Sequence, residues 1–190
     1  MEKPILFVNA CVRADSRTKY LADRLLNRLG QPCEEVRLWE FPFLPADGAF
    51  LDMRDRLLAG GDLGSPVLAP ARQFARAETV VIAAPYWDLS FPAALKQYLE
   101  QINVVGVTFR YTAEGVPEGL CRAKRLYYVT TAGGFYAPEE FGFGYVKALA
   151  QGYYGIQDVR KLEAVGLDMD GADVDAILRS AEGTILELIR

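Results

Sequence analysis

The sequence predicts a doubly wound α/β fold in which five parallel strands form one sheet in the order 2-1-3-4-5, with helices on both faces. Two observations predict this fold. Apolar runs of strand length alternate with segments of helical periodicity along the 190 residues, as in consecutive βαβ units. The length suits a single domain, residues 1–190, and no internal repeat or low-complexity tract interrupts it. The strand order follows because crossover connections are short and right-handed.

The first strand and the helix after it are the clearest elements. Residues 5–8 form an unbroken apolar run, which is typical of a strand covered on both faces. The polar loop 13–17 follows, and Asp15 or Ser16 is suited to cap the helix that starts there. Gly30 stands where a helix-ending glycine is expected. The apolar positions that share one face of this helix are Leu21, Leu25, Leu26 and Leu29.

The later elements follow from the same two patterns. Segment 41–70 is irregular apart from one helical piece near 51–59, because Pro42, Pro45, Pro66 and Pro70 interrupt it. The expected order is that of flavodoxin-like folds, which bind ligands at the carboxyl ends of the strands, beside the first and third strands. The other expected strands are 35–38, 79–83, 126–130 and 159–165, and the other expected helices are 92–102, 144–153 and 174–188.

Composition excludes several classes of function. The chain has no histidine, which rules out Ser-His-Asp and Cys-His catalysis and His-ligated zinc. The net charge of -4, without a basic run, gives no attraction for a nucleic acid. Cys11, Cys33 and Cys121 form no C-x-x-C pair, so we expect reduced thiols in a cytoplasmic protein and no metal site. The apolar run near the N-terminus is too short for a signal peptide or a membrane span, so we expect no membrane insertion.

The loop 10–18 has the chemistry of an anion site. Ser16 and Thr18 supply hydroxyls, Arg13 and Arg17 supply charge, and the start of a helix supplies free N–H groups. The glycines of the P-loop and of the two-phosphate Rossmann motif are absent, so the loop suits a monophosphate. The alternative is that the hydroxyls only cap the helix and the arginines are solvated.

Two further loops are expected at the same edge of the sheet. Residues 84–92 bring Tyr86 and Trp87, whose aromatic planes suit a flat ring, although such side chains also serve as core packing. Residues 130–136 contain Gly133 and Gly134, which allow the backbone to approach a ligand closely or simply to turn. Together, a phosphate anchor, an aromatic shelf and a glycine turn are the three contacts that flavin mononucleotide (FMN) requires.

The sequence also resembles the FMN-dependent NAD(P)H azoreductases and quinone reductases of flavodoxin-like fold. The resemblance extends over nearly the whole chain apart from 41–70. Its most specific part is the pair G-V-T-F-R-Y and P-E-G-L. The matching segments are 84–87, 91–98, 106–111, 117–120 and the turn at Gly133–Gly134.

The resemblance implies FMN as cofactor, NADH or NADPH as electron donor, and a homodimer. Asp88 stands where many members have asparagine; its carboxylate accepts a hydrogen bond from the flavin N3–H but cannot donate one. Tyr136 stands where a histidine often follows the glycines. The implied substrate-pocket residues are Phe109, Tyr111 and Tyr136. The implied cofactor-binding residues are Ser16, Arg17, Thr18, Pro85, Tyr86, Trp87, Asp88, Leu89, Thr131, Ala132, Gly133 and Gly134.

We therefore predict an FMN-dependent NAD(P)H oxidoreductase that reduces quinones, azo compounds or nitroaromatics by two-electron ping-pong transfer. No catalytic side chain is assigned, because the flavin carries the chemistry. Aromatic residues outside the strands predict a homodimer with flavin sites at its interface. The alternatives are a flavodoxin-type electron carrier, which would not react with NADPH, and a flavin-free binding or regulatory domain, which would be colourless.

Overall fold

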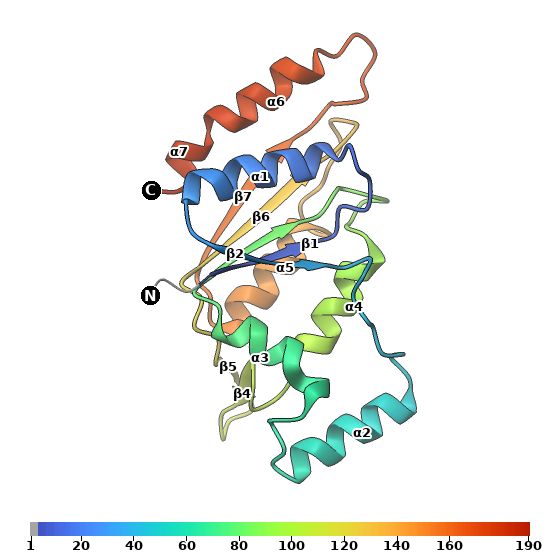
Figure 1. Ribbon diagram of the computed structural model, residues 1–190, viewed down its shortest axis with the longest axis vertical. Coiled ribbons are helices and arrows are strands. Elements are labelled where there is room, and N and C mark those ends of the chain that lie inside the picture. Colours follow the sequence, from blue (N-terminus) through green and yellow to red (C-terminus); the bar gives the residue numbers. More distant parts are fainter. Residues whose placement is uncertain (1–3) are drawn as a thin grey trace.

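The computed structural model describes residues 4–190 and contains a five-stranded parallel sheet in the order β2-β1-β3-β6-β7 (Figure 1). In terms of the sheet's own strands this is 2-1-3-4-5, so the predicted fold and order are confirmed. Each expected strand is present, with ends that differ by at most two residues. The strands are β1 Ile5–Asn9, β2 Cys33–Arg37, β3 Thr79–Ala83, β6 Arg125–Thr131 and β7 Asp158–Ala164.

Helices cover both faces of the sheet because the central strands are apolar on both sides. Leu6 and Val8 of β1 join the core beneath α3, α4 and α5, whereas Ile5 and Phe7 join the core beneath α1, α6 and α7. Figure 1 shows these two layers on opposite sides of the sheet. The helices are α1 Arg17–Leu29, α3 Ala69–Arg76, α4 Ala93–Ile102, α5 Phe143–Leu149, α6 Val174–Gly183 and α7 Ile185–Leu188.

Helix α1 begins and ends as its sequence predicts. The Ser16 hydroxyl accepts a hydrogen bond of 3.2 Å from the N–H of Lys19, so Ser16 rather than Asp15 is the cap. Gly30 adopts the left-handed conformation, with φ of 66°, and its N–H donates to Leu26 O. The Ser16 cap fixes where the helix starts and the Gly30 cap fixes where it ends. The first turn of the helix consequently lies at the carboxyl edge of the sheet.

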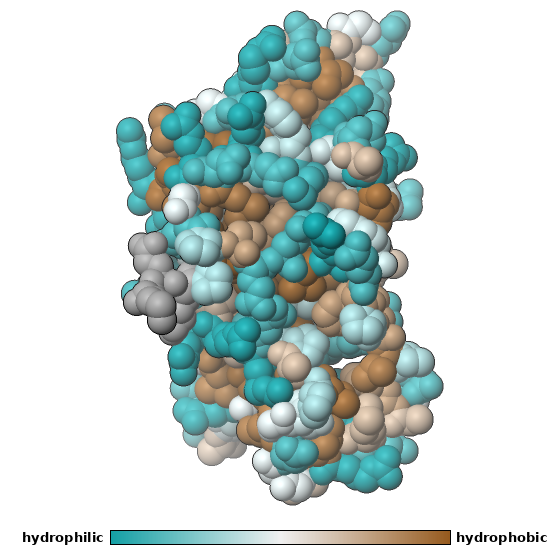
Figure 2. Space-filling model, viewed as in Figure 1, coloured by the Kyte–Doolittle hydropathy of each residue, from teal (hydrophilic) through white to brown (hydrophobic). Residues whose placement is uncertain are grey.

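The segment before β3 contains more helix than predicted. Helix α2, Gly48–Ala59, was expected in part, but α3 was not expected at all. Pro70 suggested a break, yet it lies in the first turn of α3, where a missing N–H has no consequence. Phe74 of α3 is fully buried, whereas α2 buries only Phe50. On the face in Figure 2, brown side chains reach the surface in the lower part, where α2 lies.

A β-hairpin that the sequence did not reveal as strands connects α4 to β6. Its strands, β4 Phe109–Tyr111 and β5 Pro117–Gly119, pair antiparallel. Because the hairpin leads into the start of β6, it lies at the amino end of the sheet (Figure 1). Phe109 and Tyr111 therefore lie at the end of the sheet opposite its carboxyl edge.

Two predicted helices differ in detail. The helix expected over 144–153 is α5 followed by a π-helical turn, Ala150–Tyr154, that ends at Gly155. The helix expected over 174–188 breaks into α6 and α7 at Thr184, whose hydroxyl donates to Ala181 O. Within residues 4–190, no helix is long and apolar enough to cross a bilayer.

Candidate functional site

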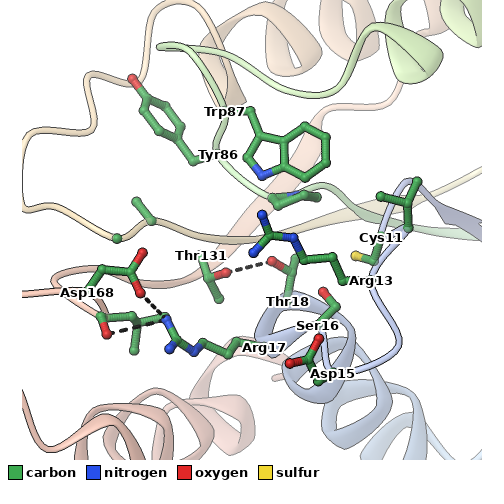
Figure 3. A pocket seen from close by; sticks show the side chains of 15 residues that line it. Cys11, Arg13, Asp15, Ser16, Arg17, Thr18, Tyr86, Trp87, Thr131 and Asp168 are labelled. Atoms are coloured by element: carbon green, nitrogen blue, oxygen red, sulfur yellow. Dashed lines mark hydrogen bonds and ion pairs between the residues drawn. The ribbon is translucent and has the colours of Figure 1, made fainter.

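A cavity of about 350 Å³ opens at the carboxyl edge of the sheet, where the loops after β1, β3, β6 and β7 meet (Figure 3). This volume is within the range of roughly 300–1,000 Å³ that small-molecule sites occupy. Its lining residues are Cys11, Val12, Arg13, Asp15, Ser16, Arg17, Thr18, Pro85, Tyr86, Trp87, Thr131, Ala132, Gly133, Leu167 and Asp168.

The first loop presents backbone donors to the cavity. The N–H groups of Arg17 and Thr18 begin α1 and have no acceptor within the described residues. Asn9, the last residue of β1, anchors the start of this loop: its side chain accepts a hydrogen bond from Cys11 N at 2.9 Å and donates one to Glu35 at 2.7 Å. Free N–H groups and the positive end of the helix dipole make this corner suited to an anion.

The Thr18 hydroxyl is not free to bind an anion, because it is already hydrogen-bonded. It lies 2.6 Å from the Thr131 hydroxyl in a buried hydrogen bond that joins α1 to the end of β6. This bond fixes the distance between the first loop and the third. Thr18 therefore contributes its N–H and its position to the site, while its hydroxyl is committed to Thr131.

The two arginines of the first loop have different surroundings. Arg17 donates to Asp168 at 2.6 Å and to Leu167 O at 3.3 Å, so its guanidinium points toward the loop after β7. Arg13 extends into the middle of the cavity, between Thr18 and Trp87 (Figure 3). Arg13 is thus the cation with no carboxylate partner among the residues that line the cavity.

The charges and the thiol around the cavity limit its chemistry. Asp15 and Asp168 formally balance Arg13 and Arg17, so binding of an anion depends on the backbone N–H groups and on Arg13. Burial raises the pKa of the Cys11 thiol to about 11, with the Ser16 hydroxyl acting in the opposite direction. The thiol is therefore protonated at neutral pH and is not a nucleophile.

The second loop forms a tight turn beside the cavity. Trp87 and Ser90 exchange two backbone hydrogen bonds of 3.0 and 2.8 Å. Asp88 and Leu89 between them have φ of 52° and 66°, which is a rare conformation for residues other than glycine. Such strain often occurs at functional sites. The turn places the Trp87 indole over the cavity, whereas Asp88 and Leu89 form its tip outside the lining.

The third loop continues the pairing of β6 with β7 beyond the sheet. Asp168 N donates to Gly133 O at 2.9 Å, and Leu167 N donates to Ala132 O. A Cβ at Gly133 would lie 2.2 Å from the Asp168 carboxylate, so a side chain there would displace Asp168. Gly133 therefore permits Asp168 to stay over the loop and reach Arg17.

Nine of the twelve predicted cofactor-binding residues line this one cavity. The other three, Asp88, Leu89 and Gly134, are adjacent to it in sequence but do not line it. Sequence reasoning missed Leu167 and Asp168. They lie in the loop after β7, three and four residues beyond its end, and this position at the carboxyl end of a parallel strand was the signal that could have identified them.

The three predicted substrate-pocket residues do not lie at the cavity. Within one chain, Phe109 and Tyr111 belong to the hairpin at the amino end of the sheet, so their assignment to a substrate pocket stays a prediction. Phe109 is buried against Tyr153 instead, at 4.7 Å between ring centroids. Tyr136 is 80% exposed and does not line the cavity. In the described part of the chain, no group of three or more Cys, Asp or Glu side chains could hold a metal ion.

Comparisons with known proteins agree with this architecture. A family model described as flavodoxin-like fold matches residues 3–189. The chain is 35% identical over 186 residues to an FMN-dependent NADH:quinone oxidoreductase of Clostridium beijerinckii, with 93% of each chain covered. It is 42% identical over 184 residues to a protein of the same name from Clostridium perfringens, with 90% of each covered.

Solved structures support the fold. An azoreductase from Bacillus anthracis matches with a TM-score of 0.84 at 22% identity and 98% coverage of both chains. An FMN-dependent NADH-azoreductase of the same organism, solved in complex with FMN, matches with a TM-score of 0.82 at 22% identity, with 98% of this chain and 97% of that chain covered.

Proposed function

Because the chain belongs to the flavodoxin-like family that includes the FMN-dependent NADH:quinone oxidoreductases, we propose that it passes two electrons from a reduced nicotinamide, through bound FMN, to a quinone, azo or nitroaromatic acceptor. The predicted oxidoreductase activity and the predicted FMN and nicotinamide cofactors are confirmed at this level by the relatives. The electron-carrier and flavin-free alternatives are correspondingly disfavoured. The free thiols of Cys11, Cys33 and Cys121 support the proposal of a cytoplasmic location.

The observation that carries this proposal is the composition of the cavity. One end offers the unpaired N–H groups of Arg17 and Thr18, which suit a phosphate, and the Arg13 guanidinium in the middle of the cavity adds a positive charge. The other end offers the rings of Tyr86 and Trp87, which suit a flat heteroaromatic ring (Figure 3). The residues present therefore fit a monophosphate nucleotide of the FMN type.

FMN supplies the acceptance and donation of a hydride when it is bound, so the protein's part is to bind, orient and exclude water. The N–H groups of Arg17 and Thr18 hold the phosphate end. Trp87 and Tyr86 shield the ring end. The Tyr86 hydroxyl donates to Pro138 O at 3.2 Å, and burial raises its pKa, so it remains a protonated wall residue.

We further propose that donor and acceptor use the same space in turn. Tyr86 and Trp87 line this cavity, so a donor and an acceptor that both have to reach a ring bound beside them would do so in turn. The expected kinetics are ping-pong, with parallel double-reciprocal lines.

We also propose a homodimer with two sites at the interface. Phe135, Tyr136 and Phe141 are all more than half exposed beside the cavity, and Tyr111 is half exposed on the distant hairpin. Exposed apolar groups of this kind mark interaction surfaces. Packing of the hairpin of a second copy over the cavity would bring Tyr111 to the substrate side, which the single chain does not.

Anaerobic titration tests the function directly. The protein as purified should have the absorbance of a flavin, and NADH or NADPH should bleach it; addition of a benzoquinone should then restore it. A colourless protein whose fluorescence does not change when FMN is added would contradict the proposal. A coloured protein that neither nicotinamide reduces would instead favour the electron-carrier alternative.

A further inference from the structure

A second, much smaller cavity lies behind the wall of the first. Tyr86 and Ala132 line both cavities, so they form a partition between them. The small cavity is on the α5 side of the sheet, under the segment 137–143. Its other principal lining residues are Tyr128, Thr130, Lys161 and Glu163.

Two hydroxyl groups in this cavity have no protein partner. Tyr128 is 1% exposed and Thr130 is 6% exposed, and neither Tyr128 Oη nor Thr130 Oγ1 makes a hydrogen bond within residues 4–190. They are two residues apart on β6, so both side chains point to the same face of the sheet. A buried polar group without a partner is unfavourable, so two such groups beside one cavity require an explanation.

The electrostatics show that the two hydroxyls influence each other. Burial raises the pKa of Tyr128, and a weak interaction with the Thr130 hydroxyl acts against that increase, although the two oxygens do not meet the geometry of a direct hydrogen bond. Tyr128 is therefore protonated at neutral pH. Each hydroxyl can donate one hydrogen bond and accept another, so the pair suits a small ligand that does both.

The size and charge of the cavity select the ligand. Its volume is about 10 Å³, close to what one water molecule needs. The cation beside it is already neutralised, because Lys161 bonds to Glu139 and lies 2.7 Å from Glu163. Lys161 Nζ is also 5.6 Å from the centroid of the Phe143 ring. An anion would meet these carboxylates, and the volume is too small for an organic molecule.

We propose that one ordered water molecule binds in this cavity and bridges Tyr128 Oη and Thr130 Oγ1. The water satisfies both hydroxyls and fills the space behind Tyr86. It is thereby a structural part of the partition between the small cavity and the larger one. This inference concerns the folded chain and does not depend on which nucleotide the larger cavity binds.

The sign of a stability change tests the proposal. Tyr128→Phe and Thr130→Val each remove one hydroxyl and keep the shape of the side chain. If water bridges the pair, each substitution removes a hydrogen bond and leaves the other hydroxyl poorly satisfied, so the Tm should fall by about 2–4 °C. If the hydroxyls are dry, each substitution removes an unfavourable buried group, so the Tm should stay the same or rise.

Tyr98 provides a matched control. Its hydroxyl is also buried without a partner, but its ring packs in the core against Phe41, with 5.6 Å between centroids. Tyr98→Phe should therefore leave the Tm unchanged or raise it. A rise in all three variants would overturn the proposal, whereas a fall confined to Tyr128→Phe and Thr130→Val would support it.

Diffraction from crystals of the wild-type protein gives a second readout that does not depend on the stability of any variant. A density peak within hydrogen-bond distance of both oxygens is expected, with the flavin bound or absent. A well-ordered cavity with no such peak, at a resolution where other internal waters are visible, would overturn the proposal.

Discussion

Arg17 and Asp168, 151 residues apart in the sequence, form an ion pair of 2.6 Å that joins the first turn of α1 to the loop after β7. Both side chains are substantially exposed, so the pair contributes little to global stability. Its importance is local, because it determines which guanidinium is available to an anion in the cavity. With Arg17 committed to Asp168, Arg13 is the available one.

Asp168→Asn should strengthen FMN binding. The substitution removes a negative charge from the lining and releases Arg17 toward the phosphate corner. The dissociation constant, from titration of the apoprotein followed by flavin fluorescence, should fall by up to about fivefold at low salt and by less at high salt. Asp170→Asn, in the same loop but outside the lining, is the control. Weaker binding in the Asp168 variant would mean that this carboxylate itself contacts the cofactor.

Arg13→Ala should weaken FMN binding more than Arg17→Ala. Loss of a charge-assisted hydrogen bond corresponds to about 1.5–3 kcal/mol, or roughly a 10- to 150-fold higher dissociation constant. Arg28→Ala, in the last turn of α1, changes the same net charge away from the cavity. The sequence alone indicated Arg17 as the anchor. A larger effect of Arg17→Ala would show that Arg17 leaves Asp168 when the phosphate binds.

Gly133→Ala should impair FMN binding, and Gly134→Ala should not. The new Cβ at position 133 would lie 2.2 Å from Asp168 Oδ2, whereas at position 134 the nearest atom is 3.9 Å away. The new Cβ would also lie 2.9 Å from Asp168 Cγ and 3.1 Å from its Cβ, so the loop backbone that pairs Asp168 N with Gly133 O would have to shift, whereas Asp168→Asn leaves that backbone in place. Pairing Gly133→Ala with Asp168→Ala removes the obstructing carboxylate, so the double variant should recover much of the loss. If the double variant does not recover binding, a clash with the Asp168 carboxylate is not the reason why Gly133→Ala binds FMN poorly.

Thr131→Val should destabilise the fold. The substitution removes one partner of the buried 2.6 Å bond with Thr18 and leaves the Thr18 hydroxyl unsatisfied, at about 1–3 kcal/mol. Urea unfolding measures the change. Thr79→Val is the control, since Thr79 begins β3 and makes no side-chain hydrogen bond in the described chain. Equal effects of the two substitutions would show that the hydroxyl pair adds nothing.

The sheet and most of the cavity could be predicted because they depend on local patterns. Apolar runs identify buried parallel strands, and the carboxyl ends of such strands are the ligand-binding edge. Helix α3 was missed because Pro70 has opposite meanings in the first turn and in the interior of a helix. That distinction becomes clear only when Phe74 is seen in the core.

The side-chain partners could not be predicted, because they depend on contacts between distant residues. Nothing near Arg17 in the sequence indicates Asp168, and nothing near Thr18 indicates Thr131. The hairpin strands were missed since each has only three residues and their pattern carries no alternation long enough to read. Because these strands were missed, the sequence alone did not show that Phe109 and Tyr111 lie apart from the cavity within one chain.

The proposed dimer predicts that the hairpin acts on the cavity of the other copy. Tyr111 is 51% exposed at the amino end of the sheet, so within one chain it cannot shield the ring end of the cavity. Tyr111→Glu would place a charge in the proposed interface, where it would be desolvated without a partner. Sedimentation equilibrium at micromolar concentration should then show a shift from dimer to monomer, and NADPH-dependent reductase activity should fall in parallel.

Leu186→Glu is the matched control, because Leu186 is 49% exposed on α7, far from the hairpin in Figure 1. That control variant should remain dimeric and active. A wild-type monomer with full reductase activity would refute the dimer, since one chain would then complete the pocket alone.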